Sequence, residues 1–334
     1  MHELYKLNDG SYSMIRAADT DLSWHGLESV ISADEPFQTW LDHPVFDWKI
    51  QRSKVRFNVD REGTQLEMPS QHVLFRSDNQ KPLSIVSEDY HIVQPRQVLE
   101  FFHDLCETNG LKMDTAGCIR DGVKFWALAR TGNEVNVGSI RDVVKQYVLL
   151  ASSCDSSMAT TAKHTSLRVV CSNTFHANIN NGEASVKVRH SRQFNESEVK
   201  INLGLMDDEF ALFGDYANEM SKIMITLTDA QRWLVELLAD KAGMTDDEIA
   251  DFANKSRVFR SVWESYIKAP GAQPTLWGAF NSITHNVDWI KGRSFDTRFD
   301  SAQFGAGAAL KQKAWEKAAA VIEGIKSANA VLAA

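Results

Sequence analysis

The stretch from residue 111 to residue 131, LKMDTAGCIRDGVKFWALART, decides the fold class of this chain. Two apolar-rich runs, residues 111–119 and 123–131, are separated by Arg120, Asp121 and Gly122. An Asp-Gly pair between two such runs is a strong signal for a β-hairpin, because both residues tolerate the positive φ angles of a tight turn. The stretch therefore predicts two antiparallel strands.

The flanking sequence extends this hairpin and adds helices on both sides. Residues 143–153 and 160–173 are equally strand-like, so the centre predicts an antiparallel meander. Before it, Pro95 opens and Asn109-Gly110 closes a run with apolar residues at helical spacing. After residue 175 the pattern is helical at 209–241, 246–267, 276–289 and 308–332, with a loop to Phe299 and an extended basic piece at 183–192.

The predicted fold class is α+β, with a central antiparallel β-meander between preceding and following helices and a helical C-terminal half. Residues 1–60 are expected to form an irregular N-terminal arm with a few aromatic anchors. Residues 61–193 are expected to form a β-rich core with a basic groove, and residues 194–334 a helical region. Short strands are expected at 55–60 and 72–76, around a turn at Arg61-Glu62-Gly63.

The composition is that of an ordinary globular protein. The chain has 334 residues, 43% of them hydrophobic and 24% charged, which excludes a disordered chain or a coiled-coil rod. No window approaches 18 consecutive apolar residues, and no secretory leader is visible, so a cytoplasmic protein without membrane contact is expected. The four cysteines include no Cys-x-x-Cys pair and are expected to be reduced thiols.

The net charge of −8 is unevenly distributed. Residues 112–192 hold eleven Lys and Arg against six Asp and Glu, whereas residues 194–260 hold fourteen acidic residues against seven basic ones. An acidic protein is not expected to coat nucleic acid indiscriminately. A confined basic segment is compatible with a groove for an anionic ligand, or with charges scattered over a solvated surface.

The sequence favours none of four kinds of catalytic or cofactor site. No Cys or His pair has metal-finger spacing, and Cys154 and Cys171 lie in apolar runs typical of core positions. Residues 152–157, SSCDSS, are turn formers before they are nucleophiles. Glu183 with Lys187 and Glu198 with Lys200 have the acid-to-lysine spacing of a metal-dependent nuclease, but without an acidic partner. Residues 304–308, FGAGA, lack the remainder of a phosphate loop, so no catalytic residue, metal or cofactor is predicted.

The remaining constellation is basic and predicts binding of single-stranded nucleic acid. Such side chains neutralise phosphates, and aromatic side chains can stack on bases. Alternation along residues 186–190 places Lys187 and Arg189 on one face of an extended strand. Phe125, Trp126 and Phe175 are candidates for base stacking, although each is more typical of a core. The predicted nucleic-acid contacts are Lys124, Arg141, Lys145, Lys163, His164, Arg168, Lys187, Arg189 and Arg192, with His190 beside them.

Two blocks of sequence resemble a known family. Residues 147–157, YVLLASSCDSS, precede residues 166–175, SLRVVCSNTF, and residues 277–284, WGAFNSIT, precede Asp288 and Phe304-Gly305. This pattern resembles the phage/plasmid-like family, also called domain of unknown function nine-three-two, over roughly residues 70–320. Residues 155–157 read Asp-Ser-Ser where the family is expected to have Asp-Gly-Ser. The resemblance implies mobile-element biology in a cytoplasmic setting, and no established catalytic residue.

The order of elements is also similar to that of phage single-strand annealing proteins. This resemblance implies a ring or filament of identical copies, with single-stranded DNA along a groove lined by Lys163, Arg168, Lys187, Arg189 and Arg192. The leading hypothesis is a mobile-element protein that binds single-stranded DNA and promotes annealing and recombination without hydrolysis. The alternatives are a protein-binding regulator or anti-defence factor acting through its acidic helical half, residues 207–251, and a metal-dependent nuclease.

Overall fold

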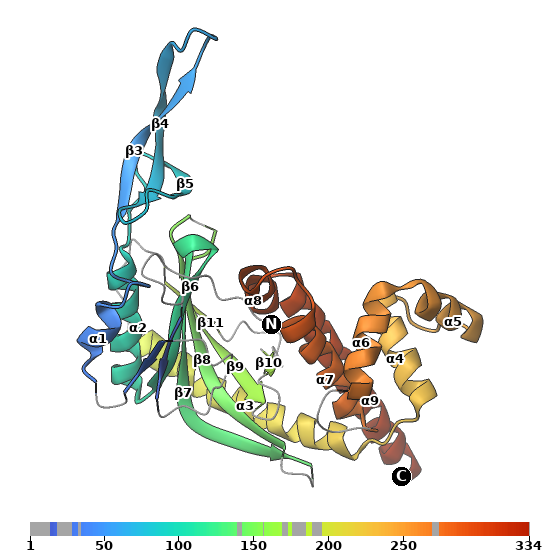
Figure 1. Cartoon of the computed structure of the whole chain (residues 1–334). Helices are drawn as coiled ribbons and strands as arrows, with labels where there is room; N and C mark the ends of the chain where they lie inside the picture. Colours follow the sequence, from blue (N-terminus) through green and yellow to red (C-terminus); the bar gives the residue numbers. More distant parts are fainter. Residues whose placement is uncertain are drawn as a thin grey trace. The chain divides into compact units, whose positions relative to one another are not determined.

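The fold is described from a computed structural model, shown in Figure 1. The structure describes residues 14–18, 29–32, 35–138, 142–155, 157–168, 173–175, 185–188, 196–268 and 274–333. The chain divides into two compact units. The first comprises Met1–Thr131, Tyr147–Lys163 and Ser185–Leu203, and the second comprises Gly132–Gln146, His164–Ala184 and Gly204–Ala334. The α+β class predicted from the sequence is confirmed.

The larger sheet contains the predicted meander. Its strands follow the order β10-β9-β8-β7-β6-β1-β2, and β11 also pairs with β9. The strand bounds are β1 (Met14–Ala17), β2 (Ser29–Ile31), β6 (Lys112–Ile119), β7 (Lys124–Val137), β8 (Asp142–Ser153), β9 (Thr160–Arg168), β10 (Asn173–Phe175) and β11 (Ser185–Val188).

The hairpin between β6 and β7 forms where the Asp-Gly pair predicts it. The two strands are antiparallel, with Ile119 opposite Lys124 across a 3-10 turn at Arg120–Gly122. Asp121 has a φ of 58° and Gly122 a φ of 98°. The turn therefore uses the left-handed backbone region that Asp and Gly tolerate.

The described part of residues 1–60 is more regular than the sequence predicts. β1 pairs antiparallel with β6, and Met14 and Ile15 are fully buried. The short helix α1 (Phe37–Leu41) follows β2, and contacts α2 (Pro95–Asn109). These segments are short, so their periodicity is too brief to be recognised, and long-range pairing fixes their structure.

A second sheet consists of β3 (Ile50–Asn58), β4 (Gln65–Arg76) and β5 (Pro82–Ser87), all antiparallel. Figure 1 shows β3 and β4 as a two-stranded ribbon that continues beyond β5. The predicted strands at 55–60 and 72–76 are parts of this longer hairpin. Of residues 51–70, all but Val55 are exposed, so the ribbon contributes almost nothing to the core.

Helix α2 agrees with its sequence prediction at both ends. The amide of Gln94 donates to the side-chain oxygen of Gln97, and Gly110 ends the helix with a left-handed φ of 67°. Val98, Phe102 and Leu105 recur on one face and are buried. Their spacing is therefore that of an amphipathic helix packed against a core.

The C-terminal half is helical, with breaks that the sequence analysis missed. The predicted helix 209–241 is divided after Lys222, because Thr226 caps a new helix through the amide of Asp229. The predicted helix 246–267 is divided at Ser256, and the predicted loop before Phe299 contains a capped helix. The helices are α3 (Glu196–Lys222), α4 (Leu227–Ala239), α5 (Asp246–Lys255), α6 (Arg257–Lys268), α7 (Leu276–His285), a π-helix η2 (Asn286–Ile290), α8 (Phe295–Phe304) and α9 (Ala306–Ala333).

Stacked aromatic rings form the centre of the second unit. Phe213 of α3 stacks on Trp315 of α9 with ring centroids 5.0 Å apart, and Phe280 of α7 meets Trp315 edge-on at 5.5 Å. All three side chains are buried. The last helix, predicted at 308–332, therefore packs inside its own unit through Trp315.

Candidate nucleic-acid interface

β9 and β11 form an antiparallel ladder in the first unit, and this ladder holds the best-placed predicted contact. Thr161 and Lys163 are half-buried, whereas Thr160 and Ala162 are buried. Successive residues of a strand point to opposite faces, so the face with Lys163 is the more open one. The register places Lys187 opposite Thr161 and Ser185 opposite Lys163. Because directly opposed positions share a face, positions 163 and 187 fall on the same side of the ladder.

Two predicted contacts are wrong because their side chains are buried. His164 packs inside the second unit, with its ring edge-on to Phe210 at 5.6 Å between centroids. Burial lowers the pKa of His164 to about 4, so the ring is neutral near pH 7. Lys124 is 8% exposed, because it lies opposite the buried Ile119 where the sheet is covered on both faces.

The aromatic candidates for base stacking next to Lys124 are also core residues. Phe125 and Trp126 are each 1% exposed. The ring of Phe125 lies 5.8 Å from that of Trp48 and 6.0 Å from that of Phe46, between centroids. These rings hold the β6–β7 hairpin against the N-terminal segment, and cannot reach a base at the surface.

The other predicted contacts are not assembled into one site. Lys145 is half-buried on β8, in the part of that strand assigned to the second unit. Arg168 ends β9, and its side chain is not described. The remaining predicted contacts lie outside the described residues: Arg141, Arg189, His190 and Arg192.

A second row of basic residues, which was not among the predicted contacts, lies on β3. Arg52, Lys54 and Arg56 alternate along β3 and are exposed. Glu67 accepts from Lys54 at 2.6 Å and from Arg56 at 3.1 Å, and the bond from Lys54 is the main cause that lowers the pKa of Glu67. Exposed pairs of this kind contribute little stability. Residues 52–56, RSKVR, alternate between basic and uncharged side chains, as residues 187–189 do. The same alternation could therefore have indicated this row from the sequence.

The loop between β8 and β9 is a structural turn. The Ser153 hydroxyl donates to the Met158 carbonyl and accepts from its amide, both at 3.0 Å. The amide of Ser157 donates to Asp155 at 3.0 Å. Partial burial alone would raise the pKa of Asp155, but hydrogen bonds from Ser157 and Ser153 lower it overall. The hydroxyl of Ser153 is thus committed to the turn and is a poor candidate for a nucleophile.

Arg76 binds the β6–β7 turn, and Cys154 joins the β8–β9 loop to the same turn. Its guanidinium lies 3.9 Å from the centroid of a Trp48 ring and donates to the Asp121 carbonyl at 2.9 Å. It also forms a two-pronged ion pair with Asp78. The Cys154 thiol donates to the Gly122 carbonyl at 3.5 Å, and burial raises the pKa of this thiol to about 12. Cys154 is therefore an unreactive core residue, as predicted.

The C-terminal sequence block is equally structural. Trp277 donates its indole N–H to Asp142 at 2.8 Å, and every residue from Leu276 to Thr284 is buried. Asp288 and Lys311 form a buried ion pair at 2.8 Å. Next to them, the amide of Gly307 donates to the Ser301 hydroxyl, so the Gly-x-Gly segment packs on α8.

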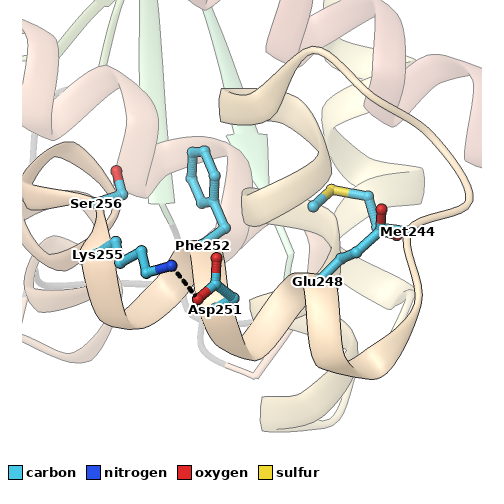
Figure 2. Close-up of a pocket in the computed structure, with 6 residues that line it drawn as sticks. All are labelled: Met244, Glu248, Asp251, Phe252, Lys255 and Ser256. Atoms are coloured by element: carbon cyan, nitrogen blue, oxygen red, sulfur yellow. Dashed lines mark ion pairs between the residues drawn. The ribbon is translucent and has the colours of Figure 1, made fainter.

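A groove of about 400 Å³ lies on one side of α5 in the second unit (Figure 2). Its apolar residues are Met244 and Phe252, and its charged residues include Glu248, Asp251 and Lys255. Lys255 pairs with Asp251 at 2.6 Å, as the dashed line in Figure 2 marks. A hydrogen bond from Lys241 lowers the pKa of Glu248. This is the acidic helical half to which the regulator hypothesis assigned protein binding.

The described residues contain no group of three or more His, Cys, Asp and Glu side chains that could hold a metal ion. Of the acid-to-lysine pairs considered for a nuclease, Glu183 lies outside the described residues and the side chain of Glu198 is not described. Within the same described ranges, every helix is too short or too polar to cross a membrane.

A family model for a domain of unknown function (DUF932) matches residues 82–315. The match begins at β5 and ends within α9, so β3 and β4 lie outside it. No curated protein and no solved structure matches the chain.

Proposed function

This chain belongs to the DUF932 family, and we propose that it binds single-stranded nucleic acid and promotes annealing of complementary strands, through the face of the β9–β11 ladder that includes Lys163 and Lys187. The observation that carries the proposal is the contrast between the two faces of β9. One face, at Thr160 and Ala162, is buried, whereas the other, at Thr161 and Lys163, is partly open.

The chemistry of annealing needs few residues. A protein that holds the phosphates by lysine side chains leaves the bases free to pair with a second strand. The ammonium group of lysine binds a phosphate as a point charge, so the binding does not depend on the base sequence. On this face of the ladder each lysine lies opposite a small hydroxyl residue, with Lys187 opposite Thr161 and Lys163 opposite Ser185, so a nucleic-acid backbone can approach the ladder closely. No hydrolytic group is required.

The test is fluorescence anisotropy of a labelled single-stranded oligonucleotide at several salt concentrations, without divalent metal. We expect binding by the wild-type protein to weaken with salt. The double variant Lys163→Glu and Lys187→Glu should bind more weakly and reduce the slope of log K against log salt by about 1.4, since each lost contact removes about 0.7 on single strands.

Lys291→Glu with Arg293→Glu is the matched control, because it changes the net charge equally at two exposed loop positions in the second unit. The control should bind as the wild type does. If both double variants weaken binding equally, the effect is one of net charge and the proposed interface is rejected. Absence of binding by the folded wild-type protein at low salt would reject nucleic-acid binding itself.

Annealing is measured separately, from energy transfer between donor- and acceptor-labelled complementary strands. The wild-type protein should accelerate their pairing without nucleotide or metal, and Lys163→Glu with Lys187→Glu should abolish the acceleration. Binding without any acceleration would leave a single-strand binding protein and reject the annealing step.

The groove on α5 favours a second candidate, a regulator that binds another protein. Its apolar side chains, Met244 and Phe252, lie beside Glu248 and Asp251, which pair with Lys241 and Lys255, so the groove suits a partner segment that is mainly apolar and carries charges of both signs. A partner captured from cell extract by the wild-type protein and lost with Phe252→Glu, together with no affinity for oligonucleotide, would favour this function over annealing.

A further inference from the structure

The small sheet of β3, β4 and β5 has two unlike faces. Ile50, Leu74 and Val86 lie on one of them and are buried, so this face packs on the first unit. The charged row of β3 continues along the same side, since Glu67 binds both Lys54 and Arg56. The other face is turned to solvent.

The solvent-facing side carries exposed apolar side chains at both of its ends. Phe57 lies directly opposite Leu66, and Val73 lies directly opposite Ile85. Val59 and Met68 follow two residues after Phe57 and Leu66, and therefore share their face. The exposed fractions are 47% for Phe57, 49% for Val59, 51% for Leu66, 47% for Met68 and 60% for Ile85.

This apolar face carries no charge. The residues of β3 on it, from Gln51 through Ser53 and Val55 to Phe57, are all uncharged. A surface that binds phosphates would place basic residues here, but they lie on the opposite face. A charge-free face can also be laid against a copy of itself without bringing like charges together.

The area of the face is suited to association of two copies. A side chain of this size presents on the order of 150 Å² when fully exposed, so five that are half exposed present about 400 Å². In a standard interface each partner buries about 800 Å², of which about 57%, or roughly 450 Å², is apolar. The exposed apolar area of these five side chains is close to that value.

We propose that the apolar face of β3, β4 and β5, centred on the Phe57–Leu66 pair, is the surface through which two copies of this chain associate. A two-stranded ribbon is only marginally stable alone, and pairing of two ribbons would bury its exposed apolar side. Most of the surface belongs to β3 and β4, outside the segment matched by the family model. The surface is also distinct from the β9–β11 face, so the two proposals stand or fall separately.

The test is the molar mass of the full chain, measured by light scattering after size exclusion and by sedimentation over a concentration series. The wild-type protein should form at least a dimer. Phe57→Glu with Leu66→Glu should weaken self-association by at least about a hundredfold, because each carboxylate would be buried against apolar side chains.

Asn58→Glu with Gln65→Glu is the matched control, since Asn58 and Gln65 are the adjacent opposed pair on the other face. It introduces the same two charges at directly opposed exposed positions, and should retain the wild-type mass. If the first variant fails to fold, Ile85→Glu at the other end of the same face replaces it. A monomeric wild type, or a mass unchanged by the charges on the apolar face, would overturn the proposal.

Discussion

His164 permits a quantitative test of the second unit's interior. In the folded protein burial lowers the pKa of this imidazole from 6.5 to about 4. The unfolded chain therefore binds a proton on His164 at pH values where the folded chain does not. Protonation of His164 therefore favours the unfolded state. The contribution of the neutral, buried ring to the free energy of unfolding is complete above about pH 6.5 and is lost as the pH falls towards 4.

The size of the effect follows from the two pKa values. The difference between 6.5 and about 4 lowers the free energy of unfolding by about 3 kcal/mol at a pH where His164 is protonated in both states. About 2 kcal/mol of this decrease occurs between pH 7 and pH 5. Other titrating groups contribute to the same pH range. They contribute equally to a variant that lacks only this ring, so the comparison isolates His164.

The assay is urea unfolding of the wild type and His164→Leu at pH 7 and pH 5, followed by circular dichroism. The variant is destabilised at both pH values by altered packing beside Phe210, and this offset cancels in the comparison. The wild type should lose about 2 kcal/mol more than the variant between pH 7 and pH 5. If the free energy of unfolding decreases equally in both proteins, His164 is not buried as a neutral ring. It would then again be a candidate contact for phosphates.

Three further substitutions test other parts of the fold. Gly122→Ala should lower the free energy of unfolding by about 2–4 kcal/mol, because its Cβ would lie 2.5 Å from the Trp48 ring at a φ of 98°; an unchanged thermal midpoint would contradict this. Lys311→Met should cost about 3–5 kcal/mol by leaving Asp288 buried without its partner, and adding Asp288→Asn should recover part of the loss in a double-mutant cycle. Thr226→Ala should cost about 1 kcal/mol in urea unfolding by removing the cap of α4, and a loss below about 0.3 kcal/mol would speak against that cap.

The sequence predicted the meander and α2 well because both depend on local signals. The Asp121-Gly122 turn and the Pro95 and Gly110 helix ends need particular backbone angles, which few residue types supply. The breaks at Thr226 and Ser256 were missed although Thr226 is a good cap, because the apolar periodicity continues across them. The segments of the N-terminal arm were missed for the opposite reason, since they are too short to show a period.

The candidate site was harder to predict than the fold. Alternation along β9 separates the face of Lys163 from that of His164, but nothing in the alternation says which face a helix covers. Phe210, more than forty residues later, decides that His164 is the buried one. Lys124 follows a turn, where exposure is expected, yet both faces of the sheet are covered there. Burial of this kind depends on contacts between distant segments.

The blocks that carry the family resemblance stabilise the fold in every contact described for them. Ser153 and Asp155 close a turn, Trp277 binds Asp142 inside the second unit, and Asp288 neutralises Lys311. The surfaces proposed for binding include the half-buried Lys163 and the exposed Phe57. Substitutions in the blocks should therefore lower stability first and binding only as a consequence. A loss of oligonucleotide binding by a Trp277 variant bears on the interface only if the variant is still folded at the assay temperature, whereas a loss at Lys163 in a protein of wild-type stability reports on the interface directly.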